Sequence, residues 1–228
     1  MDKSKNYEKE IPADYVLVKH VNANNDKKQM TIYTLLSFVP LVIILPLLVL
    51  IAVYGCGYDF TAILSTQGAI VLFVTCGVLI LYTILHELTH GITYKFYTGS
   101  KLTFGFNFVV AFCGVPEIYV RKQASIVALA MPFVVFNLVL IGLTVGLWFV
   151  SPLYGVVAGV VLAIHLGGCV GDLHWIMLYN TKFKHCHTLM RDTGPEQWLY
   201  IPQAEADQYG IPVLPDGETN SSIRGSDV

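Results

Sequence analysis

The chain has 228 residues, of which 54% are apolar and 13% are charged, and its formal net charge is −2. Soluble domains carry about 25% charged residues, so this composition argues against a soluble domain and indicates that much of the surface faces lipid. The slightly acidic balance argues against a nucleic-acid partner held by phosphate contacts.

Residues 1–30 form a mostly polar N-terminal segment that contains six lysines. A secretory signal would place a short apolar stretch closer to the start, followed by a small-residue cleavage site. We therefore expect no cleaved signal and interpret residues 1–30 as a cytoplasmic segment that precedes the first membrane span.

Four apolar stretches follow, and each is long enough to cross a bilayer core, which takes about 20 helical residues. They lie at residues 31–53, 68–93, 124–150 and 153–179. The sequence thus predicts an all-α membrane protein with four transmembrane helices over residues 31–180, whose surroundings are the lipid bilayer.

All 14 Lys and Arg residues fall on one side of this four-span arrangement. They lie in the N-terminal segment, in the connection between spans two and three, and in the C-terminal tail, whereas the other two connections contain none. Because cytoplasmic loops are enriched in Lys and Arg, both termini are predicted to be cytoplasmic.

The connection between spans two and three contains residues 102–108, where aromatic residues alternate with small or polar ones. Such alternation is typical of strands, so we expect a short cytoplasmic hairpin there, with an aromatic interfacial loop as the alternative. The tail over residues 181–228 is rich in Pro and Gly turn signals. It is predicted to be an irregular cytoplasmic tail, disordered after about Gly217.

The second span ends with the sequence His-Glu-Leu-Thr-His at residues 86–90. On a helix, His86 and His90 project from one face, one turn apart, so their imidazoles can share a metal. Zinc held in this way lowers the pKa of its water towards about 7, and Glu87 can then accept the proton as general base. An ionisable cluster inside a lipid-spanning helix is costly unless it is partnered, which favours a metal site over a polar patch at the helix end.

Span four offers three candidates for a third ligand: His165, Cys169 and Asp172. Residues seven apart on a helix are separated by about 20° in projection, so His165 and Asp172 share a face. Asp172 matches the histidine pair in its distance from the next basic residue, whereas His165 would lie about 10 Å deeper. Depth favours Asp172 as the zinc ligand, and His165 and Cys169 remain alternatives.

Small and polar residues also stand out in the last two spans. Gly167, Gly168 and Gly171 are predicted to let span four approach span two closely. In span three, Pro132 interrupts the helical hydrogen bonds and frees a carbonyl, while the amide of Asn137 needs a partner. Asn137 is interpreted either as a substrate-binding residue or as a hydrogen-bond partner of a neighbouring helix.

Three segments together resemble a bacterial family of membrane proteins described as putative zincin peptidases. They are HELTHG at the end of span two, IYVRKQASIVALAMP at the start of span three, and GGCVGDL in span four. The resemblance covers roughly residues 70–180. It implies a metallopeptidase in a bacterial plasma membrane.

The same segments are similar, more broadly, to site-2 proteases, the intramembrane zinc enzymes that cut membrane-anchored regulators. That resemblance implies a zinc site and an intermediate proline and asparagine, mapped here onto His86, His90 and Asp172 as ligands, Glu87 as base, and Pro132 and Asn137. Met131 replaces the usual glycine before the proline, and Leu173 replaces the glycine after the aspartate.

The sequence therefore predicts a zinc metalloendopeptidase that acts on a membrane-anchored or membrane-associated protein. A strand from residues 102–120 is expected to bind an extended substrate by edge pairing. The alternative is a catalytically inactive metal-binding membrane protein that acts as an interaction partner or chaperone. A transporter is disfavoured, because one ionisable cluster near one face provides no continuous polar pathway.

Overall fold

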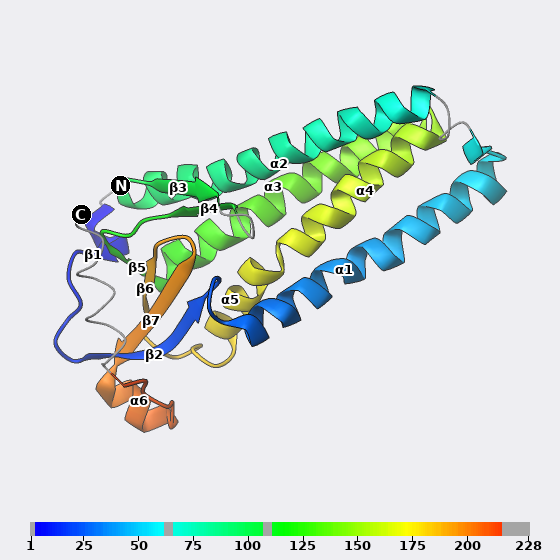
Figure 1. Ribbon diagram of the computed structural model, residues 1–228. Helices are drawn as coiled ribbons and strands as arrows, with labels where there is room; N and C mark the ends of the chain where they lie inside the picture. The colour runs from blue at the N-terminus through cyan, green and yellow to red at the C-terminus, as the bar shows by residue number, and fades with distance from the viewer. Residues whose placement is uncertain (1–2, 62–65, 107–110, 216–228) are drawn as a thin grey trace. The chain divides into compact units, whose positions relative to one another are not determined.

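The computed structural model describes residues 3–61, 66–106 and 111–215 of the chain (Figure 1). The fold consists of two compact units. The helical unit comprises Lys27–His90 and Ala128–Ile176, and the mixed unit comprises the three remaining segments. Each unit is described below by itself.

The helical unit is built from long apolar helices. These are α1 (Lys27–Leu50), which continues as a π-helical turn (Ile51–Gly55), α2 (Thr66–Thr98), α3 (Lys122–Trp148), α4 (Pro152–Gly168) and α5 (Val170–Asn180). By length and composition, three spans can cross a membrane: Lys27–Gly55, Gly68–Thr98 and Lys122–Trp148. The pair α4 and α5, bent by 44° at Cys169, passes the same test as one broken span and would be the fourth.

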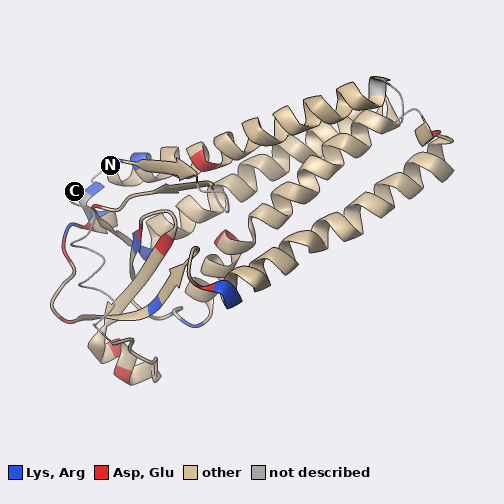
Figure 2. Cartoon of the chain, viewed as in Figure 1, with Lys and Arg blue, Asp and Glu red and all other residues tan. Residues whose placement is uncertain are grey.

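Charge is almost absent from the helical unit, as Figure 2 shows by the few coloured residues on its helices. Its charged residues are Lys27, Lys28, Asp59, Glu87 and Asp172. Large apolar side chains instead cover the outside of the helices; Phe73 of α2, for example, is 82% exposed. An apolar surface of this extent is suited to lipid, not to water.

Helix α1 packs along α4, and glycines of α4 make this packing close. A Cβ atom at Gly167 would meet the backbone carbonyl of Ser37 in α1. Of the glycines expected to face the second span, only Gly168 has its nearest neighbour in α2, whereas Gly171 faces α1. The small residues therefore bring the broken span against the first helix more than against the second.

The mixed unit contains a five-stranded antiparallel sheet in the order β1-β5-β6-β7-β2. Its strands are β1 (Tyr7–Glu8), which follows a short 3-10 turn (Lys3–Asn6), β2 (Tyr15–Asn22), β5 (Tyr119–Arg121), β6 (Leu189–Asp192) and β7 (Glu196–Pro202). Helix α6 (Gln203–Tyr209) contacts β2 and β7. Leu17, Leu189, Trp198 and Tyr200 form a buried cluster on these strands.

The all-α fold class predicted from the sequence is wrong. The described part of the chain contains six α-helices and two antiparallel sheets, and the tail predicted to be irregular provides β6, β7 and α6. Strand β2 pairs with β7 over the register from Tyr15 opposite Pro202 to Asn22 opposite Glu196. Short strands whose partners lie almost a whole chain away carry little local signal, because their pairing depends on the tertiary fold.

The hairpin expected between spans two and three is present. Strand β3 (Thr103–Phe106) pairs antiparallel with β4 (Ala111–Gly114). The fourth span, expected as one helix, is broken at Cys169. The disorder predicted after Gly217 falls outside the described residues.

Gly167→Ala should lower the stability of the helical unit, because its new methyl group collides with backbone atoms of α1 that cannot rotate away. Overpacking of this kind costs about 1–3 kcal/mol, which should appear as an earlier unfolding transition of the purified protein in detergent. Gly142→Ala in α3 is the matched control, since among the described residues no heavy atom lies within 4 Å of its Cβ position apart from its chain neighbours and the backbone of its own helix. An unchanged transition for Gly167→Ala would contradict the close packing.

Candidate metal centre

The two histidines of the HELTH sequence lie on one face of α2, with both side chains buried. Asp172, in the first turn of α5, lies close to both histidines. Its Oδ2 atom lies 3.6 Å from Nε2 of His86 and 3.3 Å from Nε2 of His90. All three residues belong to the helical unit, and their ligand atoms lie within 4.8 Å of one another.

These distances suit ligands of a shared ion better than direct hydrogen bonds. A charge-assisted bond between an imidazolium and a carboxylate spans about 2.7–2.9 Å, and both distances here are longer. Zinc bonds to histidine nitrogen and carboxylate oxygen are each about 2.0–2.2 Å long, which places neighbouring ligands of a tetrahedral ion about 3.4 Å apart. The residues present therefore fit zinc in donor type and in spacing.

The distribution of charged residues in the helical unit also supports a metal site. Glu87 and Asp172 place two carboxylates in apolar helices, and the sequence has no Lys or Arg between Lys28 and Lys95 or between Lys122 and Lys182. An unpaired charge in lipid costs several kcal/mol. A divalent cation would balance both carboxylates, which supports a metal at this position.

His90 is oriented by the backbone of α3. Its Nδ1 atom lies 2.9 Å from the carbonyl oxygen of Ala128. That oxygen would normally accept the N–H of the residue four positions later, but this residue is Pro132, which has no N–H to donate. The imidazole Nδ1–H donates instead, which leaves Nε2 of His90 facing Asp172 with its lone pair available to a metal.

His86 is held by a different arrangement. Its Nδ1 atom lies 3.0 Å from the hydroxyl of Tyr82, one turn earlier in α2, and that hydroxyl lies 2.8 Å from Nδ1 of His165 in α4. The Sγ atom of Cys169 is 3.6 Å from the same His165 nitrogen. His86, His165 and Cys169 thus form a second group whose atoms lie close enough for one metal.

The structure brings His86, His90 and Asp172 together, as the sequence predicted for a zinc site, with Glu87 next to His86 and partly buried. Asn137 donates from Nδ2 to the Phe133 carbonyl of its own helix at 2.7 Å, and its role in substrate binding stays a prediction. His165, expected about 10 Å deeper than Asp172, also lies near the site, with its ring centroid 6.1 Å from that of His86.

Tyr82 and Phe136 are site residues that the sequence reasoning missed. The Phe136 ring lies 5.3 Å from the Tyr82 ring, 6.2 Å from that of His86 and 5.9 Å from that of His165. Tyr82 had a signal, since residues 82, 86 and 90 follow the helical spacing that singled out the two histidines. Phe136 had none, because it is one of many apolar residues of α3.

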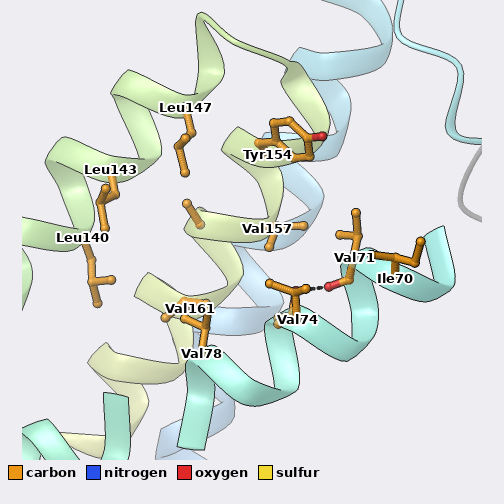
Figure 3. Close-up of a pocket in the computed structure, with 12 residues that line it drawn as sticks. Ile70, Val71, Val74, Val78, Leu140, Leu143, Leu147, Tyr154, Val157 and Val161 are labelled. Atoms are coloured by element: carbon orange, nitrogen blue, oxygen red, sulfur yellow. Dashed lines mark hydrogen bonds between the residues drawn. The ribbon is translucent and has the colours of Figure 1, made fainter. Parts of the chain in front are cut away.

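A separate cavity of about 440 Å³ lies among α2, α3 and α4 (Figure 3). Its lining is apolar except for Thr75 and Tyr154, and the Thr75 hydroxyl already donates to the Val71 carbonyl. The cavity contains no group that could hold a metal or transfer a proton at neutral pH, so the chemistry is assigned to the histidine cluster.

Comparison with known proteins identifies one related family. Residues 79–187, just under half of the chain, match the model of a family described as "Putative zincin peptidase". The matched segment includes His86, His90 and Asp172. No curated protein and no solved structure matches the chain. The family match indicates a metallopeptidase of the zincin type, with zinc as its implied cofactor.

Replacing Pro132 by alanine should weaken zinc binding, because the new backbone N–H competes with His90 for the Ala128 carbonyl. Loss of a hydrogen bond that orients a metal-binding histidine costs roughly 10–100-fold in affinity, and we expect about tenfold here, measured by competition with a chelator. Pro46→Ala in α1 removes a helix-interior proline far from either histidine in sequence and should leave the affinity unchanged. Equal affinities for the two variants would contradict this role of Pro132.

Proposed function

We propose that this chain is a zinc endopeptidase, similar to site-2 proteases, that hydrolyses peptide bonds of membrane-anchored or membrane-associated proteins. The observation that carries the proposal is the convergence of His86, His90 and Asp172 inside an apolar helical unit whose other charged residues are Lys27, Lys28, Asp59 and Glu87. The match to a zincin family over residues 79–187 supports the same class.

His86, His90 and Asp172 would hold the zinc ion, and Glu87 would perform the proton transfers. Bound zinc supplies Lewis acidity, which makes a water molecule more acidic and polarises the carbonyl of the scissile bond. The Glu87 carboxylate accepts the proton of the attacking water and returns it to the leaving amine, as a general base and then a general acid. Glu87 occupies the position after His86 in α2, so a ligand and the base are held by one rigid helix.

The β3–β4 hairpin is the element that we assign to substrate binding. Peptide bonds in a helix are shielded by their own hydrogen bonds, and a strand can hold a substrate in extended form by pairing with its backbone. In the mixed unit, a Cβ atom at Gly91 would lie 2.7 Å from Phe104 of β3 and 3.1 Å from Sγ of Cys113 in β4. Glycine at position 91 therefore allows the hairpin to contact α2 directly at this residue.

The proposal also includes a topology. The Lys and Arg distribution supports a multi-pass protein with both termini in the cytoplasm of a bacterial cell, provided that the bent pair α4 and α5 counts as one span. The HELTH sequence comes five residues before Lys95, the first basic residue after the second span. This supports a reaction at the cytoplasmic edge of the membrane.

Glu87→Gln should keep zinc and lose proteolysis, because glutamine is similar in size but cannot accept the proton. We expect the purified variant to contain as much zinc as the wild type. Membranes of cells that express the variant should lack the new protein N termini that wild-type expression produces, as measured by N-terminal peptide mass spectrometry.

Asp172→Ala provides the companion control, since it should lose both the zinc and the new N termini. Cleavage by Glu87→Gln at the wild-type rate would rule out the proposed proton transfer. Full zinc content of the wild type without any new N terminus would instead favour the inactive metal-binding partner or chaperone.

Cys56 offers a test of the topology, because it is exposed and lies between the first and second spans. A membrane-impermeant maleimide should label it in intact cells, and Cys56→Ser should abolish this labelling. Background from the tail is expected to be low, since burial raises the pKa of the Cys186 thiol and keeps it protonated. Labelling of Cys56 only after permeabilisation would show that the protein has the opposite orientation in the membrane.

A further inference from the structure

We propose that Tyr82 and His165 are positioning residues, which fix the proton of His86 on Nδ1 and so leave its Nε2 atom as the metal ligand. This inference rests on the proposed zinc site and specifies what holds it in shape. It also assigns a role to His165, which neither the reaction nor the three-ligand site uses. The observation that carries it is the placement of the Tyr82 hydroxyl between Nδ1 of His86 and Nδ1 of His165.

The order of protons along these hydrogen bonds follows from the proposed zinc site. An imidazole that binds a metal through Nε2 has its proton on Nδ1, so Nδ1–H of His86 donates to the Tyr82 hydroxyl at 3.0 Å. That hydroxyl then donates to Nδ1 of His165 at 2.8 Å. The lone pair of His86 Nε2 faces Asp172.

The surroundings keep this order in place. His165 is fully buried, and the Phe136 ring packs against the rings of Tyr82, His86 and His165. Where water is excluded, a polar group without a partner is costly. Breaking the hydrogen bond to Tyr82 would leave Nδ1–H of the buried His86 without this partner, which favours the order that keeps both bonds.

The competing assignment makes His165 and Cys169 metal ligands together with His86. The position of Tyr82 argues against it, because its hydroxyl lies at hydrogen-bond distance from both imidazoles, 3.0 Å and 2.8 Å. A metal bound by both Nδ1 atoms would have to displace that hydroxyl. The Asp172 group needs no such rearrangement, since the Nδ1 atoms of His86 and His90 both already have partners other than a metal.

Tyr82→Phe tests the inference, because it removes the hydroxyl and keeps the ring against Phe136. We expect zinc affinity, measured by chelator competition on the purified full-length protein, to fall by about tenfold, within the range typical of such outer partners. The visible absorption of the cobalt-substituted protein should also change, since the geometry at His86 is altered. Tyr154→Phe is the matched control; it removes a tyrosine hydroxyl of α4 at the apolar cavity and should change neither measurement.

His165→Gln serves as a second variant if Tyr82→Phe does not fold, and it should also weaken zinc binding while one zinc ion per chain still binds at saturation. Wild-type affinity and spectrum in the folded variants would overturn the inference and leave the proposed function standing. A sulfur-to-cobalt charge-transfer band in the wild type that disappears in Cys169→Ser would also overturn it, since the metal would then lie in the other group. A wild type that binds no zinc would overturn both proposals.

Discussion

The rest of the helical unit depends on one constraint, the cost of placing ionisable side chains in apolar helices that are long enough to span a membrane. The helices of this unit contain two carboxylates and four imidazoles, and the sequence has no Lys or Arg between Lys28 and Lys95 or between Lys122 and Lys182. Each of these groups must find a partner inside the protein, because lipid offers none. The cluster of His86, His90 and Asp172 satisfies this requirement if it holds a divalent cation, and the hydrogen-bond partners around it satisfy the remaining nitrogens.

The two histidines are oriented by different hydrogen-bond partners, and in both cases Nδ1 is bonded and Nε2 faces the metal site. His90 donates to the Ala128 carbonyl, which is available because Pro132 supplies no N–H. His86 is held through the Tyr82 hydroxyl, a side-chain partner from its own helix. The partner of His90 is a backbone carbonyl, and the partner of His86 is a side-chain hydroxyl. Two residues outside the HELTH sequence, a proline and a tyrosine, therefore determine which nitrogen each histidine presents to the metal.

The expectations for the candidate site that the sequence could support depend on local spacing, and zinc binding by these residues stays a prediction. His86 and His90 follow from the four-residue repeat of a helix, and Asp172 followed from its depth relative to basic residues. The five-stranded sheet could not be found in this way, because strands such as β1 have two residues and pair with segments far away in the chain. The hairpin β3–β4 was predicted because its two strands are neighbours in sequence and its aromatic alternation is local.

Asp172 and His165 lie on the two sides of the break in the fourth span, and both are close to groups that surround His86. Along a straight helix, their seven-residue separation corresponds to a rise of about 10 Å, whereas here the helices that carry them meet at a 44° bend at Cys169. A break inside a membrane span is costly when it exposes backbone groups. Here the Cys169 N–H still donates to the His165 carbonyl at 3.1 Å, and the Leu173 N–H to the Cys169 carbonyl at 2.9 Å. The backbone thus stays paired through the bend, so one span can provide both a metal ligand and the residue that orients another.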